Sequence, residues 1–494
     1  MKDNKTSELN IIRERIFNED INNNEAYFAF ETFVLNVLKD YVNSQGKSIK
    51  RYGNSDKLFD AFLPDGIDDS SVPTYVEIIY TRANQNVYFR SVEKICLKAS
   101  DDIEQILIIL GAKFSLNSKE SIVNLACART NAKVIIWGFE DLYIKAKQYF
   151  DIYYEYLRQP KRAIVEKAIT TDKTYDEKIK DKEILLSKLR IKYQDEDVAL
   201  FLGAGVSIDA KVPLWNDLIY KLLIEMINTK LEAQRKNLDS NQLGLLIDLA
   251  YKNKEESPLT QMRYIRSAFE SSIYNKIIHK ILYEKNPKPN TELLKAIAQI
   301  CTPRRNHIGV RGIVTYNFDD LVENCLKHRD IHHCTIYKET DLPYIDRLSI
   351  YHVHGYMPRN LNDISENECN IIFSEEDYHK VYIDAYCWSN IVQLNYFREN
   401  TCVFIGSSLT DPNLRRLLDV AARSGEEPRH FAIMKKKSLF NENGAINKID
   451  RKVLDLYKNI DDSIRESFFA TLGLNIIWVD DYNEIPEILR WLST

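Results

Sequence analysis

Short apolar runs that end in a polar or glycine turn recur along the second half of the chain. They stand at residues 198–202, 312–315, 348–352, 371–373, 401–405, 430–434 and 474–479. Continuous apolar runs of this length, alternating with segments of helical periodicity, are typical of strands buried in a parallel sheet. The pattern predicts an α/β fold with a Rossmann-like, doubly wound parallel sheet over residues 197–494.

A long helical stretch interrupts this alternation between the first and second runs. Apolar residues at three- and four-residue spacing predict helices over 218–227, 242–251, 261–283 and 291–300. We therefore expect a helical insertion at 218–305 within the C-terminal domain.

Residues 1–155 show a second, smaller α/β pattern. It comprises predicted helices over 24–42, 118–130 and 140–157, and predicted strands over 58–62, 75–80, 106–110 and 134–137. Residues 156–196 carry mixed charges at helical spacing, which indicates a solvated helical connector. The sequence thus predicts an N-terminal domain (1–155), a connector (156–196) and a C-terminal domain (197–494).

Composition and charge narrow the class of protein. The chain is 45% hydrophobic and 28% charged, with a net charge of -5, which gives no case for general nucleic-acid binding. No apolar run approaches the roughly 18–20 residues needed to span a bilayer. The eight cysteines include no CxxC pair, so we expect neither a disulfide framework nor zinc. These features predict a cytoplasmic protein with no membrane partner.

Four polar segments follow predicted strands of the C-terminal domain. They are GAGVSIDAKVP (203–213), TYNFDDL (315–321), HVHG (352–355) and GSSLTDPN (406–413). The carboxyl ends of parallel strands meet at a ligand crevice, so these segments are expected to converge. The first begins with a glycine turn that opens onto a helical segment, and bare N–H groups there predict a pyrophosphate site. Ile208 replaces the third glycine of a dinucleotide fingerprint, which disfavours an ordinary nicotinamide dehydrogenase.

These segments, in this order, resemble the SIR2 (sirtuin) family, and more closely the SIR2-like proteins of bacterial antiphage defence. The resemblance implies NAD⁺ as the substrate. It implies a pyrophosphate and ribose loop made by Gly203, Ala204, Gly205 and Ser207. It further implies a T-x-N-x-D motif made by Thr315, Asn317 and Asp319, in which Asn and Asp address the nicotinamide ribose and the carboxamide. The resemblance also implies that His354 is the catalytic histidine, and that Gly406, Ser407 and Ser408 contact the adenosine side.

The chemistry of these residues suits cleavage of a glycosidic bond. A histidine can accept a proton from a ribose hydroxyl or from water near neutral pH. Between His354 and Gly406 there is no CxxC…CxxC zinc ribbon, and Lys211 stands where the resemblance expects glycine. These departures favour hydrolysis of NAD⁺ to ADP-ribose and nicotinamide. A zinc-less protein deacylase is the alternative within the same resemblance.

The resemblance to defence proteins also carries expectations about regulation. It implies an effector of abortive infection whose activity is gated by a partner or by assembly. Related defence operons pair such effectors with a HerA-like ATPase or another sensor, and we expect a homo-oligomer. The activating trigger does not follow from the sequence.

The order of elements in residues 1–155 resembles the restriction-endonuclease-like fold. Glu31, Asp60 and Glu77 fall where that fold holds Mg²⁺ through carboxylates. Ile79 stands where its lysine belongs, which predicts a degenerate nuclease. A nuclease regulated by NAD⁺ or ADP-ribose is therefore a further alternative, and the sequence leaves open whether this domain touches nucleic acid.

Overall fold

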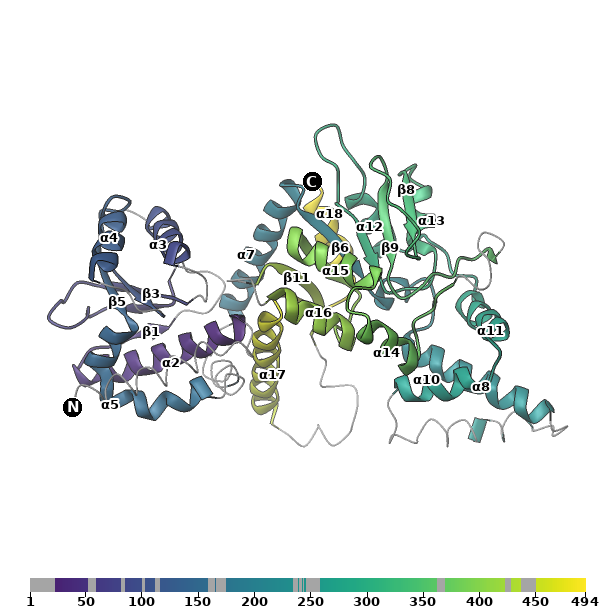
Figure 1. The fold of residues 1–494 in the computed structure, drawn as a ribbon, viewed down its shortest axis with the longest axis horizontal. Coiled ribbons are helices and arrows are strands. Elements are labelled where there is room, and N and C mark those ends of the chain that lie inside the picture. Colours follow the sequence, from purple (N-terminus) through teal and green to yellow (C-terminus); the bar gives the residue numbers. More distant parts are fainter. Residues whose placement is uncertain are drawn as a thin grey trace. The chain divides into compact units, whose positions relative to one another are not determined.

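The computed structural model divides the chain into two compact units (Figure 1). It describes residues 23–51, 59–80, 85–99, 103–111, 116–158, 165, 175–233, 239, 242, 244–245, 258–361, 369–422, 428–436 and 450–494. The first unit draws on Met1–Leu186, Asp419–Pro428 and Lys437–Asn475. The second draws on Ser187–Leu418, Arg429–Lys436 and Ile476–Thr494.

The first unit contains a mixed five-stranded sheet. Its strands lie in chain order: β1 (Lys50–Arg51), β2 (Ala61–Leu63), β3 (Thr74–Ile79), β4 (Gln105–Leu110) and β5 (Lys133–Gly138). The pairs β1–β2 and β2–β3 are antiparallel, whereas β3–β4 and β4–β5 are parallel. All six side chains of β4 are buried because both faces of the sheet are covered by helices.

Helices cover the two faces of this sheet in separate pairs (Figure 1). α2 (Asn23–Ser44) and α5 (Phe139–Arg158) share one core, in which Phe30, Phe33 and Phe150 are buried. α3 (Gln85–Lys98) and α4 (Leu116–Cys127) share the other. α17 (Arg451–Thr471) also belongs to this unit, where Ala470 packs against Phe28 of α2. The chain pattern did not predict this long-range contact or helix α3.

The second unit is built on a seven-stranded sheet of order β12-β11-β10-β6-β7-β9-β8. The strands are β6 (Val198–Leu202), β7 (Ile313–Thr315), β8 (His333–Ile336), β9 (Leu348–His352), β10 (Thr401–Ile405), β11 (His430–Lys435) and β12 (Leu474–Val479). The strand pairs β11–β10, β10–β6, β6–β7, β7–β9 and β9–β8 are all parallel. The predicted doubly wound parallel sheet is therefore confirmed. β6 lies between β7 and β10, so the strand order reverses at β6.

The other elements of this unit among the described residues are helices. They are α7 (Tyr175–Gln194), whose first residues belong to the other unit, α8 (Trp215–Ala233), α10 (Pro258–Ser267), α11 (Ser271–Tyr283), α12 (Glu292–Ile300), α13 (Leu321–Lys327), α14 (Glu375–Ile383), α15 (Trp388–Glu399), α16 (Pro412–Ala422) and α18 (Glu484–Leu492). The helix predicted over 261–283 is broken into α10 and α11. The helix predicted over 242–251 falls largely outside the described residues.

One strand prediction was wrong, and one strand was not predicted. Residues 371–373 form no strand: Phe373 packs edge-on against Trp215, with ring centroids 4.2 Å apart, and the Ile372 N–H bonds the His354 carbonyl. Conversely, His333–Ile336 forms the edge strand β8, which the apolar runs did not predict. An edge strand needs only one paired side and one covered face, so its sequence is less apolar.

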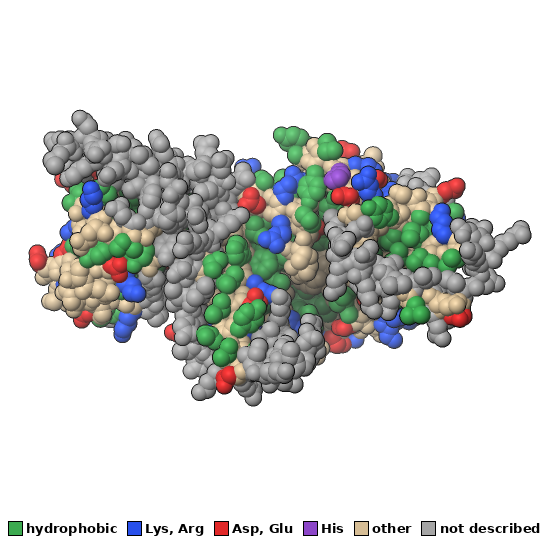
Figure 2. Space-filling view, turned by 90° about the horizontal axis from the view of Figure 1, so that it is seen from below, with side chains coloured by type: hydrophobic (Ala, Val, Ile, Leu, Met, Phe, Trp, Pro, Cys, Tyr) green, Lys and Arg blue, Asp and Glu red, His purple; other side chains and the backbone are tan. Residues whose placement is uncertain are grey.

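The surface carries mixed charges. On the face drawn in Figure 2, acidic and basic side chains are interspersed among hydrophobic ones, with no extended area of one sign among the coloured residues. In the part of the chain that the structure describes, no helix has the length and apolar character needed to cross a membrane.

Candidate active site

The four polar segments all follow the carboxyl ends of adjacent strands. Residues 203–213 follow β6, 315–321 follow β7, 352–355 follow β9 and 406–413 follow β10. These strands are neighbours in the order β10-β6-β7-β9, centred on the reversal at β6. The sheet therefore brings the predicted site segments to one edge, as expected for a ligand crevice.

The glycine turn after β6 packs directly on the turn after β10. The Gly203 N–H bonds the Ile405 carbonyl at 3.0 Å, and the Gly205 N–H bonds the Gly406 carbonyl at 2.8 Å. A Cβ on Gly203 would lie 2.6 Å from the Gly406 carbonyl oxygen. Gly406 has a φ of 66°, a conformation that favours glycine. These glycines therefore allow two loops to meet backbone to backbone.

This packing corrects the expectation of bare N–H groups at a helix start, whereas the predicted contact of Gly203, Ala204, Gly205 and Ser207 with the pyrophosphate and ribose stays a prediction. The turn does not open onto an α-helix: only a short 3₁₀ segment, Ala204–Ser207, follows it, and α8 begins at Trp215. The N–H groups of Gly203 and Gly205 are bonded to the β10 loop and are not bare donors. Lys211, in the same loop, has a φ of 73°, the left-handed conformation that glycine adopts most readily.

Ser207, Asn317 and Asp319 form one buried hydrogen-bonded chain. The Asn317 amide Nδ2 donates to the Ser207 hydroxyl at 3.2 Å, and that hydroxyl donates to Asp319 Oδ2 at 2.9 Å. Thr315 Oγ1 accepts the Asn317 backbone N–H at 3.1 Å. The Asn317 Oδ1 atom is buried and, among the described residues, has no hydrogen-bond partner. An orphaned buried acceptor is costly, which marks it as a point where a ligand or water binds.

Asp319 is engaged on both carboxylate oxygens. Its Oδ1 accepts the Leu321 N–H at 3.1 Å, while Oδ2 accepts the Ser207 hydroxyl. Burial raises the pKa of Asp319 to about 6, although these two hydrogen bonds favour the ionised form. The Asp319 carboxylate thereby holds the Ser207 hydroxyl. That hydroxyl in turn fixes the Asn317 amide nitrogen, so Asn317 Oδ1 faces away from Ser207.

His354 is buried among aromatic rings and one carboxylate. Its ring meets Tyr316 edge-on at 5.0 Å between centroids and Tyr378 at 5.7 Å. Its Nε2 lies 3.7 Å from Asp411 Oδ2, and that carboxylate also accepts the Tyr378 hydroxyl. Asp411 is itself held by the Leu414 N–H at 2.7 Å. His354 therefore has a fixed acidic neighbour.

The electrostatics of His354 favour a neutral imidazole. Burial lowers the pKa of His354 below its ordinary value, and the Asp411 charge opposes this only in part. A neutral imidazole at physiological pH can accept a proton. This is the property that a general base requires.

Ser407 and Ser408 are turned toward their own loop. Ser407 Oγ accepts the Leu409 N–H at 3.2 Å, and Ser408 Oγ bonds Thr410 Oγ1 at 2.7 Å. Their predicted contact with the adenosine side, like that of Gly406, stays a prediction.

Sequence reasoning missed Asp411, Tyr378 and Glu323. Asp411 lies within the quoted GSSLTDPN segment, but its link to His354 depends on the loops after β10 and β9 meeting, although β6 and β7 lie between these two strands. Tyr378 comes from α14, a helix whose position no motif indicates. Glu323 lies on α13, and its Oε1 is 2.6 Å from His352 Nε2.

The candidate nuclease acids of the first unit show no metal cage. Asp60 Oδ2 accepts the Ile78 N–H at 2.7 Å, and Ala61 pairs with Val76, which sets Asp60 across from Glu77. Glu31 is buried on α2. In neither unit do the described residues bring together three or more His, Cys, Asp or Glu side chains able to hold a metal. The endonuclease-like assignment is not confirmed.

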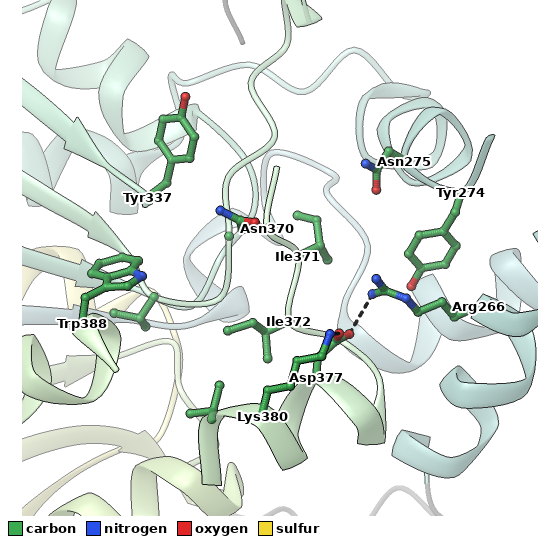
Figure 3. Close-up of a pocket in the computed structure, with 13 residues that line it drawn as sticks. Arg266, Tyr274, Asn275, Tyr337, Asn370, Ile371, Ile372, Asp377, Lys380 and Trp388 are labelled. Atoms are coloured by element: carbon green, nitrogen blue, oxygen red, sulfur yellow. Dashed lines mark hydrogen bonds and ion pairs between the residues drawn. The ribbon is translucent and has the colours of Figure 1, made fainter. Parts of the chain in front are cut away.

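A pocket of about 450 Å³ opens in the second unit beside the His354 loop (Figure 3). Val353 and Gly355, which flank His354, line it, whereas His354 and the other predicted site residues do not. Arg266 reaches across it to Asp377, with 2.8 Å between Nη1 and Oδ2. The pocket is thus separate from the Asn317 and His354 side chains.

Comparison with known proteins places a resemblance in the C-terminal part of the chain, where the four polar segments lie. Residues 311–461 match the family model described as "SIR2-like domain", which confirms the resemblance for this region. The chain is also similar to a protein named NAD(+) hydrolase ThsA from Enterococcus faecium, at 24% identity over 320 residues, which are 63% of this chain and 58% of that protein. Proteins of the same name from Bacillus cereus (strain MSX-D12) and Acinetobacter baumannii (strain 532279) match at 24% and 21% identity, over 62% and 63% of this chain and 56% of each relative. The chain therefore spans little more than half the length of these relatives.

Proposed function

We propose that this protein hydrolyses NAD⁺ to ADP-ribose and nicotinamide. The observation that carries the proposal is the pair of buried groups on the segments that follow the neighbouring strands β7 and β9: the unpartnered Oδ1 of Asn317 and the neutral imidazole of His354. Asn317 Oδ1 can accept a hydrogen bond from water or a ribose hydroxyl, and the His354 imidazole can accept a proton. The names of the similar proteins support NAD⁺ as the substrate.

The reaction needs only these groups and water. The bond between nicotinamide nitrogen and the ribose C1′ breaks, its electron pair leaves with nicotinamide, and a water oxygen bonds to C1′. His354 takes the proton released, while Asn317 Oδ1 holds either the water or a ribose hydroxyl. Because nicotinamide leaves as a neutral molecule, the leaving group needs no proton from an acid.

Incubation of the purified full-length protein with NAD⁺ tests this proposal. We expect release of nicotinamide and ADP-ribose in a 1:1 ratio, without any acylated peptide. Release that requires an acyl-lysine peptide and consumes its acyl group would instead identify a zinc-less deacylase. Absence of nicotinamide release with and without candidate activators would refute hydrolysis.

The Asp411→Asn variant is expected to move the acidic limb of the pH–rate profile to lower pH. The Asp411 carboxylate favours the imidazolium form of His354, so its loss lowers the pKa of His354 further. The neutral base is then retained at more acidic pH. We also expect a fall in kcat of about 10-fold or more, because Asp411 no longer stabilises the imidazolium formed during proton transfer. An unchanged acidic limb, measured from pH 4 to 8, would show that Asp411 does not act on His354.

We further propose that this activity serves antiphage defence and is held in check until a partner or self-assembly releases it. An unregulated NAD⁺ hydrolase would deplete its own cell, which supports gating. A HerA-like ATPase or another sensor encoded beside this chain is the expected partner. Co-expression with the neighbouring gene product, followed by measurement of cellular NAD⁺ during phage infection, tests this gating. NAD⁺ depletion that is equal without phage would contradict it.

A further inference from the structure

His352 is wholly buried between two hydrogen-bond acceptors on different elements. Its Nδ1 lies 2.9 Å from the main-chain carbonyl oxygen of Asn317, and its Nε2 lies 2.6 Å from Glu323 Oε1 on α13. The ring of Tyr356 packs beside the imidazole, with centroids 4.5 Å apart. His352 alternates with His354 along the chain, so the two imidazoles face different surroundings.

The hydrogen-bonding capacity of the two partners limits which protons the His352 ring carries. A carbonyl oxygen only accepts, so Nδ1 must carry a hydrogen and donate it to Asn317. Nε2 makes the second contact with Glu323 Oε1, so both ring nitrogens are engaged. Burial alone would lower the pKa of His352, but the Glu323 carboxylate and the contact with Asn317 outweigh it and raise this pKa. His352 and Glu323 thus form a buried ion pair tied to the Asn317 backbone.

A contribution to fold stability does not explain why this buried pair is present. Glu323 Oε2 is buried and has no hydrogen-bond partner among the described residues. Buried ion pairs of this kind contribute little to stability relative to apolar residues, and an orphaned oxygen makes the balance worse. What the pair does hold is the peptide group that carries Asn317, the residue with the unpartnered Oδ1.

We propose that Glu323 and His352 are positioning residues that fix the Asn317 peptide and thereby aim its Oδ1 into the active site. The inference rests on the proposed NAD⁺ hydrolysis and assigns two residues to it. Asn317 is then held from two sides: its side chain by Ser207, and its backbone carbonyl by His352. A misplacement of about 1 Å in such a group can cost about 100-fold in rate.

Two substitutions of His352 separate the two contacts. In His352→Asn, the amide nitrogen takes the place of Nδ1, so it can donate to the Asn317 carbonyl while the link to Glu323 is lost. In His352→Gln, the amide nitrogen takes the place of Nε2, so it can donate to Glu323 while the Asn317 contact is lost. We expect His352→Gln to lower kcat about 10-fold or more relative to His352→Asn, with little difference in KM. Equal kcat values, or a larger loss in His352→Asn, would overturn the proposal.

Hydrogen exchange provides a readout that does not depend on activity. We expect the peptide covering residues 313–322 to exchange fastest in His352→Gln, and at a rate between those of His352→Gln and the wild type in His352→Asn, which keeps the Asn317 contact but loses the anchor from Glu323. Equal exchange in the three proteins would overturn positioning even if the wild type hydrolyses NAD⁺. Faster exchange in His352→Gln with no wild-type hydrolysis would instead retain the backbone restraint and refute the proposed reaction.

A stability control excludes a general effect of loosening α13. Leu326 is buried on the same helix, and its apolar side chain cannot hydrogen-bond with His352, Glu323 or Asn317. Leu326→Ala is expected to lower the melting temperature while keeping kcat near the wild-type value well below that temperature. A fall in kcat in Leu326→Ala as large as in His352→Gln would show that stability alone explains the loss.

Discussion

The His354→Ala variant is expected to hydrolyse NAD⁺ about 10²–10⁴-fold more slowly than the wild type, which is the usual worth of a general base. The reason is local: the four site segments contain two histidines, and His352 is engaged at both ring nitrogens by Asn317 and Glu323, which leaves His354 to accept the proton. Nicotinamide release, followed with saturating NAD⁺, measures the loss as kcat.

A matched histidine variant controls for loss of a ring in general. His332 is exposed, immediately before β8, and belongs to none of the four site segments. His332→Ala should keep wild-type activity. Full activity in His354→Ala, with melting temperatures matched between the two variants, would remove His354 from the mechanism.

The Gly205→Ala variant is expected to lose both stability and NAD⁺ turnover. Its Cβ would lie 2.7 Å from the Gly406 Cα and 2.8 Å from the Gly406 carbonyl oxygen, which are backbone atoms that cannot rotate away. The β6 and β10 loops must therefore separate, and overpacking of this kind typically costs about 1–3 kcal/mol. Thermal unfolding and a titration of rate against NAD⁺ measure the two effects.

Gly138→Ala is the matched control for this substitution. Gly138 ends β5 in the other unit, and its nearest neighbour for an added Cβ is the flexible end of the Lys119 side chain, at 3.4 Å. We expect little change in melting temperature there. Wild-type stability and turnover in Gly205→Ala would show that the two loops are not in obligatory backbone contact.

The prediction of the second unit succeeded where local signals and global architecture agree. Buried parallel strands must be apolar throughout, so Val198–Leu202 and Thr401–Ile405 could be identified from the chain alone. The same pattern failed at residues 371–373, where an apolar run packs its aromatic ring against helices and pairs with no strand. The hydrophobic pattern indicates that a segment is buried. It does not indicate whether a strand or another element buries it.

The site shows the same division. The predicted residues stand at strand ends, so the rule that parallel strands end at one edge was enough to gather them. This rule did not predict the acidic residues that lie beside His354 and His352. Asp411 beside His354 and Glu323 beside His352 come from segments whose mutual position depends on how α13, α14 and α16 pack on the sheet.

By itself, the sequence determined the parallel sheet of the second unit, the order of its four polar segments and the residue types that these segments carry. These depend on local composition and on a topological rule that holds for the whole fold class. Only the tertiary structure decided what each group does. It showed that Gly203 and Gly205 serve loop packing and present no free N–H, that Asn317 Oδ1 is left without a partner, and that burial keeps His354 neutral. Hydrogen-bond saturation and desolvation are set by neighbours distant in the chain, and no local pattern carries that information.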